Sequence, residues 1–352
     1  MIIPYRLLNQ HISHHKLKKP QDIVSYLGAM QAQEYAMAKW AIGLRLPGTK
    51  DADVEKAFNK GHILRTHLLR PTWHFVSPAD IRWMLALTKD RVYAVSAFMF
   101  RKSELTDKIF NRSADIFTKM LQGGNHLERN VLKAALEKAK IPTDEFLLSY
   151  MLMHAEMEGV ICSGPRVGKQ FTYALLEERV PPVKSISREE ALNELTHRYF
   201  KSRGPATVQD FAVWSGLTAK DARNGIASLD KKFIHEKIND REFIFYKRDY
   251  SMATSDSTFL MPDYDEYGMS YRGRSDIFNK EKFAKQISRG NPIFNRMIII
   301  NGKIEGTWNR TVTKKALTIN SFPFSSLSKE NQRNLLEAEK KYRLFLGDNL
   351  EA

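Results

Sequence analysis

Two glutamine side chains, Gln31 and Gln33, are separated by a single alanine near the start of the chain. They follow an apolar segment in which the spacing of Ile23, Leu27 and Met30 predicts a helix. Residues two apart do not share a face of a helix, so both amides can reach one point only where helical geometry ends. The pair is therefore either ordinary helix surface or a loop that holds two amides toward a ligand. In a loop, the amides could orient water and stabilise positive charge through their dipoles, because an amide accepts no proton at neutral pH.

A basic hairpin is predicted over residues 65–76, directly after a helix-like run at residues 53–58. Three polar side chains project from its otherwise apolar arms: Arg65, His67 and Arg70. A helix followed by such a hairpin is the layout of a winged helix. Neighbours on a strand point to opposite faces, so we expect Trp73 to pack in the core, while His74 stays a candidate for lining a site.

The composition indicates a polyanionic partner. Lysine and arginine number 55 against 40 acidic residues, which gives a net charge of +15. A surface with this excess attracts nucleic acid or anionic membrane. Residues 1–16 are polar and no long apolar span follows, so neither a signal peptide nor a membrane segment is expected, and nucleic acid is favoured. Cys162 is the only cysteine, which excludes an internal disulfide and a multi-cysteine metal site and suggests a cytoplasmic protein.

Three units repeat one plan, in which helices are followed by a hairpin, although their sequences differ. The first unit ends in the hairpin at residues 65–76 and is followed by a predicted helix over residues 78–100. In the second unit, Asp144 caps a predicted helix that Gly159 stops. The hairpin that follows, residues 160–173, is interpreted as a second basic wing. Its turn carries Arg166 and Lys169.

The third unit is predicted to contain helices over residues 188–201, 208–215 and 219–229. A strand pair around Asn239-Asp240 closes this unit as another wing. The remainder changes character, with short β-rich runs such as residues 297–300 and a tight turn at Asn301-Gly302. We expect a small sheet or barrel there, followed by a charged helix over residues 328–346.

The predicted fold class is α+β and mainly helical, with tandem winged-helix modules followed by a small C-terminal β-barrel-like domain. The predicted domains are residues 1–104 for the first winged helix with the glutamine pair and the following helix, 105–180 for the second winged helix, 185–252 for the third, and 253–352 for the β-rich domain with its terminal helix.

An acidic cluster, Asp263, Asp265 and Glu266, stands out in a basic protein. A metal site is conceivable there. The interleaved proline and tyrosines favour a structured turn instead, in which the carboxylates pair with Arg272 or Arg274. No metal and no cofactor are therefore expected.

The glutamine pair and the hairpin after it resemble the N-terminal module of the winged-helix DNA glycosylases of the AlkZ/YcaQ type. The resemblance continues in three further regions of the chain: Arg203 to Phe211 with Trp214 to Leu217, Leu260 to Tyr267, and Glu305 to Trp308. None of these strings is specific alone, but their order over most of the chain indicates the family.

This resemblance implies a monofunctional DNA glycosylase that hydrolyses the N-glycosidic bond of alkylated purines in DNA repair, with Gln31 and Gln33 as the catalytic pair. N7-substituted purines are the expected substrates, and the glutamine-glutamine version resembles the branch that unhooks bulky or cross-linked adducts. A cationic alkylated base departs neutral and needs little acid catalysis. The remaining need is an electron-rich oxygen and a water near the oxocarbenium-like sugar.

Six side chains are predicted to contact nucleic acid: Arg65, His67, Arg70, His74, Arg166 and Lys169. The expected partner is double-stranded DNA that carries alkylated bases, bound by a monomer in the cytoplasm near the nucleoid. Because Tyr35 is the sole aromatic residue close to the pair in sequence, we expect an open channel instead of a tight base pocket. The alternative is a winged-helix DNA-binding protein or regulator without catalytic activity, which has no need to aim two amides into a site.

Overall fold

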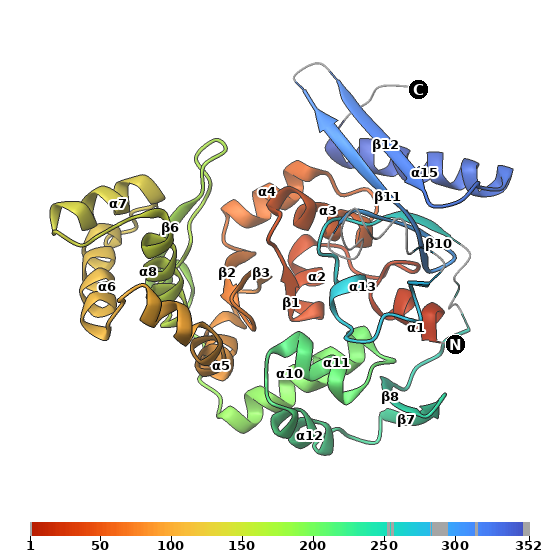
Figure 1. Cartoon of the computed structure of the whole chain (residues 1–352), viewed down its shortest axis with the longest axis horizontal. Helices are drawn as coiled ribbons and strands as arrows, with labels where there is room; N and C mark the ends of the chain where they lie inside the picture. Colours follow the sequence, from red (N-terminus) through yellow and green to blue (C-terminus); the bar gives the residue numbers. More distant parts are fainter. Residues whose placement is uncertain are drawn as a thin grey trace.

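The computed structural model describes residues 2–251, 254, 257–281, 283, 295–313 and 316–347. The described chain is α+β and mainly helical, and its small sheets are built from antiparallel strands. In Figure 1 the second unit (α6 to α8, yellow) lies at one side of the molecule, whereas the first and last parts of the chain lie together at the other.

The first unit contains helices and one three-stranded sheet: α1 (Ile2–Asn9), α2 (Pro20–Leu27), β1 (Ala29–Gln31), α3 (Tyr35–Arg45), α4 (Asp51–Asn59), β2 (Leu64–Leu68) and β3 (Thr72–Val76), followed by α5 (Ile81–Lys102). The predicted hairpin and both of its flanking helices are confirmed. The prediction that the helix continues to Met30 is wrong. Gly28 adopts a positive φ of 76° and ends α2, after which β1 pairs with β3 at the edge of the sheet.

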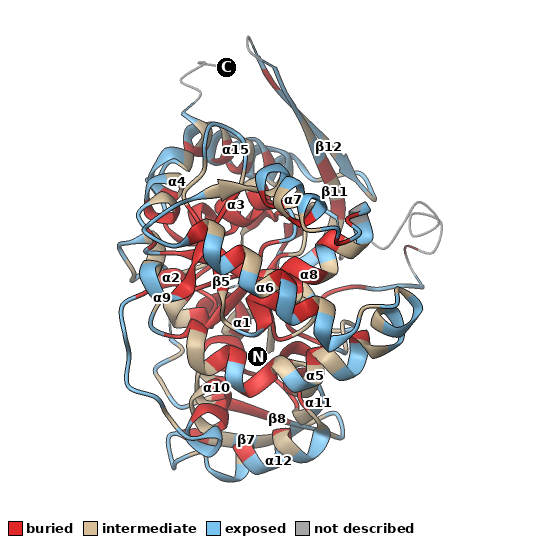
Figure 2. Ribbon diagram, turned by 90° about the vertical axis from the view of Figure 1, so that its left-hand side faces the viewer, coloured by how far each residue is buried: buried red, intermediate tan, exposed pale blue. Residues whose placement is uncertain are grey.

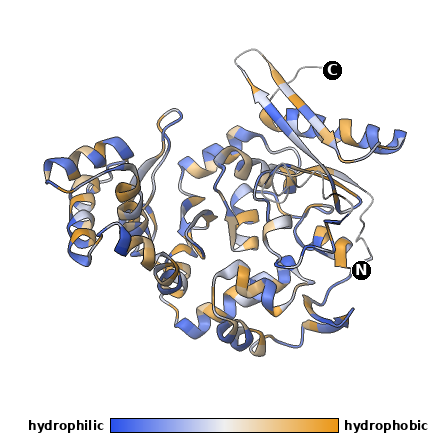
Figure 3. Ribbon diagram, viewed as in Figure 1, coloured by the Kyte–Doolittle hydropathy of each residue, from blue (hydrophilic) through white to orange (hydrophobic). Residues whose placement is uncertain are grey.

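The second unit has its own sheet and apolar core: α6 (Asp107–Leu121), β4 (Leu127–Glu128), α7 (Arg129–Lys138), α8 (Glu145–Met157), β5 (Ile161–Ser163), β6 (Thr172–Leu175) and α9 (Leu176–Arg179). The predicted cap of α8 is confirmed, because the Asp144 carboxylate accepts from two backbone N–H groups at 3.0 and 2.8 Å. Hydrophobic and hydrophilic residues alternate along these helices (Figure 3), and the outer face of α6 is exposed (Figure 2).

The third unit consists of three helices and a hairpin: α10 (Arg188–Arg203), α11 (Val208–Ser215), α12 (Ala219–Ala227), β7 (Phe233–Ile238) and β8 (Arg241–Tyr246). Gly216 ends α11 with a φ of 72°, as its sequence position predicts. A Cβ atom at Gly216 would lie 2.4 Å from the carbonyl oxygen of Leu69, so only glycine permits this approach. The turn of the first hairpin therefore rests against the end of α11.

The last part of the chain forms a four-stranded sheet, one short helix and one long helix: β9 (Thr258–Leu260), α13 (Glu266–Met269), β10 (Met297–Ile300), β11 (Lys303–Val312), β12 (Leu317–Pro323) and α15 (Lys329–Leu346). The strand order is β12-β11-β10-β9, and the sheet curls into a half-barrel. Among the described strands β9 and β12 are edges, so the predicted barrel does not close. Figure 1 shows β11 and β12 extending away from the body of the protein (blue).

Apolar residues of α1 to α4 share one core with this C-terminal sheet and α15. Within it, the Trp40 indole N–H donates to the Leu260 carbonyl oxygen at 2.7 Å, and its ring lies 5.0 Å from that of Tyr342. A second core joins α5 and the first hairpin to α10, α11 and α12. The segment that carries the glutamine pair therefore lies where parts of the chain that are distant in sequence meet.

Candidate functional site

Gln31 and Gln33 lie in the short extended segment between α2 and α3. β1 ends at Gln31, and the pairing continues one residue further because the Ala32 N–H donates to the Trp73 carbonyl oxygen at 2.7 Å. Gln31 is buried and Gln33 is exposed. Side chains two apart can share one side of an extended segment, which a helix does not allow. The pair is therefore not helix surface.

The Gln31 amide is held by Arg70, which comes from the turn of the first hairpin. An Nη2–H of Arg70 donates to Gln31 Oε1 at 3.2 Å, and its Nη1–H donates to the carbonyl oxygen of Trp214 at the end of α11. An amide oxygen has two lone pairs, so Gln31 Oε1 keeps one for a water or a substrate. Arg70 thus fixes the orientation of the Gln31 amide.

The backbone of Gln31 is held by a buried carboxylate. Its N–H donates to Glu266 Oε1 at 2.9 Å, while Glu266 Oε2 accepts from Arg203 Nη2 at 2.8 Å and from the Trp214 indole at 2.9 Å. Burial alone would raise the pKa of Glu266, but the Arg203 charge and the Gln31 N–H outweigh it and lower this pKa to about 2. Glu266 is therefore ionised at neutral pH.

Arg203 anchors the same segment at its other end. Its guanidinium donates to the Leu27 carbonyl oxygen at 2.7 Å and to the Ala29 carbonyl oxygen at 2.8 Å. Arg203 and Glu266 together thus satisfy backbone groups on both sides of Met30. This ion pair replaces the helical hydrogen bonds that the segment loses when α2 ends at Leu27.

His74 pairs with Gln31 across the sheet and is fully buried. Burial and the nearby Arg70 charge lower the pKa of His74 to about 3, so the ring is neutral at pH 7. Its Nδ1 lies 2.9 Å from the Thr72 carbonyl oxygen. A neutral ring in this position adds no charge beside the glutamine.

Arg65 and His67 point from β2 toward the second unit. The Arg65 guanidinium is buried, donates from Nε to the Ala32 carbonyl oxygen at 3.0 Å, and lies 4.1 Å from the Trp73 ring centroid. Burial lowers the pKa of Arg65 to about 10, which leaves it charged at neutral pH. His67 Nδ1 lies 2.5 Å from Glu156 Oε2. DNA contact by these side chains stays a prediction, and in this structure their partners are protein groups.

The second predicted wing presents one exposed cation. Lys169 is exposed in the turn before β6, whereas Arg166 is half-buried, donates to the Lys169 carbonyl oxygen and lies 3.5 Å from Glu55 Oε1. Lys169 is therefore the better placed of the two for a phosphate contact.

The acidic cluster has the structural role that was predicted, but with other partners. Asp263 pairs with Arg296 at 2.7 Å, Asp265 with Arg45 at 2.8 Å, and Glu266 with Arg203. The predicted pairing with Arg272 or Arg274 is wrong, because the turn at α13 faces α3 and α10. In the described part of the chain no group of His, Cys, Asp or Glu side chains could hold a metal ion, and no described helix is long and apolar enough to cross a membrane.

Sequence reasoning missed the supporting residues Arg203, Trp214 and Glu266. Each lies within a string that carries the family resemblance, so a signal was present. Their function could not be assigned because it depends on contacts between residues far apart in the sequence, such as the 2.8 Å bond from Arg203 to Ala29, which are 174 residues apart.

The model of the family "DNA glycosylase AlkZ-like" matches residues 24–345, which is most of the chain. The chain therefore belongs to the AlkZ-like DNA glycosylase family. Among individual proteins, it is 21% identical over 339 residues to a protein of Streptomyces sahachiroi named interstrand DNA cross-link repair glycosylase, covering 92% of this chain and 90% of that protein. The structure is similar to that of Streptomyces sahachiroi DNA glycosylase AlkZ, with a TM-score of 0.77 and 17% identity, over 98% of this chain and 95% of the other. At this identity the structural likeness establishes the fold.

Proposed function

We propose that this protein is a monofunctional DNA glycosylase that hydrolyses the N-glycosidic bond of N7-alkylated purines, including bulky or cross-linked adducts. Gln31 and Gln33 act at the sugar. In this reaction the bond between the sugar C1′ and the base N9 breaks, a water oxygen bonds to C1′, the cationic base leaves neutral, and the water gives up one proton to solvent.

The observation that carries this proposal is the double fixation of Gln31. Arg70 holds its side-chain oxygen at 3.2 Å and Glu266 holds its backbone N–H at 2.9 Å. A dipole that is fixed before the reaction stabilises developing positive charge without a cost of reorientation. The exposed Gln33 amide, two residues away, can orient the water. A protein that only binds DNA has no need to fix one amide by two separate hydrogen bonds.

The relative from Streptomyces sahachiroi supports the choice of substrate, since its name includes interstrand cross-link repair. Three winged-helix modules, one for each unit, would contact the duplex on several sides of the glutamine pair. We propose that the protein acts as a monomer, because three wings in one chain make a second copy unnecessary. We also propose that it acts in the cytoplasm, where its DNA substrate lies.

The test is excision of N7-methylguanine from a duplex, detected by alkaline cleavage of the abasic product under single-turnover conditions. We expect Gln31→Ala and Gln33→Ala each to lower the excision rate by about 10²-fold, the scale of removing one preorganised dipole, while duplex affinity changes little. Gln332→Ala, at an exposed position of α15, is the matched control. A wild-type protein that binds the duplex but releases no base would instead support the DNA-binding alternative.

A further inference from the structure

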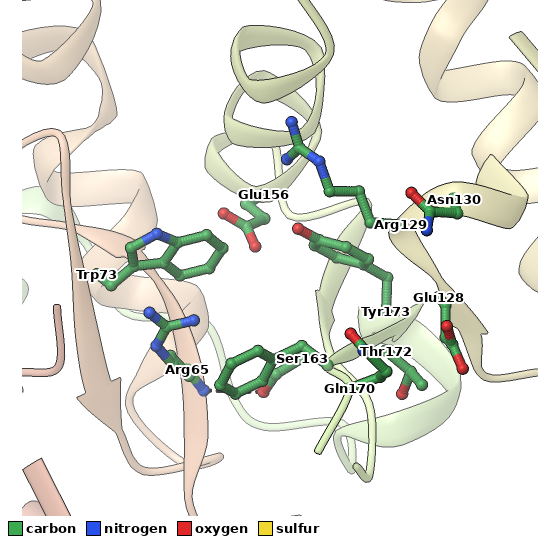
Figure 4. A pocket seen from close by; sticks show the side chains of 11 residues that line it. Arg65, Trp73, Glu128, Arg129, Asn130, Glu156, Ser163, Gln170, Thr172 and Tyr173 are labelled. Carbon is green, nitrogen blue, oxygen red and sulfur yellow. Dashed lines mark hydrogen bonds between the residues drawn. The ribbon is translucent and has the colours of Figure 1, made fainter. Parts of the chain in front are cut away.

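A pocket of about 210 Å³ lies between the first hairpin and the second unit. Trp73 and Arg65 line it from the hairpin, and Glu156, Phe171 and Tyr173 line it from the second unit (Figure 4). Pockets for drug-sized ligands begin at about 300 Å³, so this space suits one fused ring system better than a whole nucleotide.

A buried carboxylate in this pocket has an unused acceptor. Glu156 lies on α8 and is fully buried. Its Oε2 is within 2.5 Å of His67 Nδ1, whereas Oε1 has no hydrogen-bond partner within the described residues. Figure 4 shows the carboxylate directed into the space between the rings of Trp73 and Tyr173. A buried oxygen without a donor costs free energy, and a ligand N–H would remove that cost.

The walls of the pocket suit a flat ligand. The Arg65 guanidinium lies 4.1 Å from the Trp73 ring centroid and 4.7 Å from that of Phe171, so both rings are held in place by one cation. Burial raises the pKa of the Tyr173 hydroxyl, which therefore stays neutral. Flat aromatic walls together with the unpartnered Glu156 Oε1 favour a heterocycle that carries N–H groups on its edge.

The pocket is connected to the glutamine pair through two hydrogen bonds. The Ala32 carbonyl oxygen accepts from Arg65 Nε at 3.0 Å, and the Ala32 N–H donates to the Trp73 carbonyl oxygen at 2.7 Å. The residue between the two glutamines thus contacts two residues of the pocket wall. The pocket therefore lies beside the segment that carries the pair.

We propose that the pocket binds the purine released by glycosidic cleavage, with Glu156 Oε1 accepting an N–H of the base and the rings of Trp73 and Phe171 contacting its face. The identity of the ligand rests on the proposed function. The neutral product 7-methylguanine has N–H donors on the edge remote from its methyl group, which matches one free carboxylate oxygen.

The experiment is equilibrium binding of free 7-methylguanine to the full chain by calorimetry. We expect the wild type to bind, and Glu156→Met, which removes the acceptor at similar volume, to bind at least about tenfold more weakly. Trp73→Leu tests the stacking wall independently, should the buried substitution prevent folding. Glu158→Met is the matched control, because Glu158 ends the same helix but pairs with Lys89 outside the pocket.

The inference would be overturned if the wild type did not bind the base, or if both pocket variants bound it with the affinity of the wild type. Excision from a methylated duplex is measured separately. Excision without binding of the free base rejects the pocket alone, whereas Glu156-dependent binding without excision rejects the proposed function and leaves the pocket as a purine site.

Discussion

Replacing Glu266 by glutamine should destabilise the protein by several kcal/mol. Glu266 and Arg203 are both fully buried, and the substitution leaves the Arg203 charge without its partner. Breaking a buried ion pair in this way costs about 3–5 kcal/mol. The pKa of Glu266 gives a second figure. A folded-state pKa of about 2 against an ordinary value of 4.5 corresponds to about 3 kcal/mol at neutral pH.

The pH dependence follows from the direction of this pKa shift. Because folding lowers the pKa of Glu266, its contribution is present above pH 4.5 and is lost as the pH falls toward about 2. The wild type should therefore lose more stability between these pH values than Glu266→Gln does. Urea unfolding of both proteins at pH 7 and at pH 3 measures the stability lost through the substitution and the stability lost through the lower pH. Glu337→Gln, at an exposed position on α15, is the control.

Two results would refute this reasoning. One is an unfolding free energy of Glu266→Gln within about 1 kcal/mol of the wild type at pH 7, which is below the range for a broken buried pair. The other is the same acid sensitivity in both proteins. If the variant stays folded at low temperature, we also expect slower excision, because the Gln31 N–H loses the carboxylate that fixes it.

Three further predictions concern the hairpin and the substrate. Arg70→Lys should lower single-turnover excision about tenfold with little change in duplex affinity, since lysine keeps the charge but not the forked geometry that reaches Gln31 and Trp214; equal losses of both would make Arg70 a DNA contact. Lys169→Ala should flatten the slope of log duplex affinity against log salt concentration by about 0.9. Arg65→Ala should leave that slope nearly unchanged and lower the melting temperature instead. A slope that changes for Arg65→Ala but not for Lys169→Ala would contradict the burial of Arg65. A bulky N7 adduct should be excised no more than about tenfold slower than N7-methylguanine, which is a difference of roughly 1.4 kcal/mol in the barrier. The comparison uses two duplexes that differ only in the adduct. Complete rejection of the bulky adduct would exclude an open approach of the damaged base to the glutamine pair.

Local sequence signals predicted most of the helices and hairpins. Asp144 and Gly216 act on their own helix ends, through a side-chain cap and a positive φ, so their effect does not depend on the rest of the fold. The same holds for the turn at Asn301-Gly302, where both residues adopt a positive φ. The helix that was extended to Met30 failed because apolar spacing alone does not reveal a glycine that ends the helix two residues earlier.

The direction of the hairpin side chains could not be predicted in this way. An alternating strand shows which residues share a face, but not what covers that face. Here the second unit covers Arg65, whose backbone N–H donates to Ser163 Oγ at 2.8 Å, and the third unit covers Arg70. The sequence suggests that both arginines are exposed to solvent. In the folded protein they donate hydrogen bonds to the segment of the glutamine pair, Arg65 to the Ala32 carbonyl oxygen and Arg70 to Gln31 Oε1.

Folding brings further aromatic residues beside the segment that carries the glutamine pair. In sequence only Tyr35 is close, but folding brings Trp73 and Phe171 around Arg65. An aromatic surface beside the pair does not by itself require a tight base pocket, because Gln33 stays exposed. An open approach for the damaged duplex and a small pocket for the released base are therefore compatible.

Gln31 is thus positioned by distant parts of the chain and not by the first unit alone. Glu266 comes from the C-terminal part, Arg203 from the third unit and Arg70 from a turn that the third unit supports. Each of these contacts satisfies a backbone or amide group that would otherwise need water, so losing one frees the segment around Gln31 to move. Because an oriented dipole stabilises a developing charge only while its orientation is kept, these distant residues support the proposed chemistry by holding Gln31 in place.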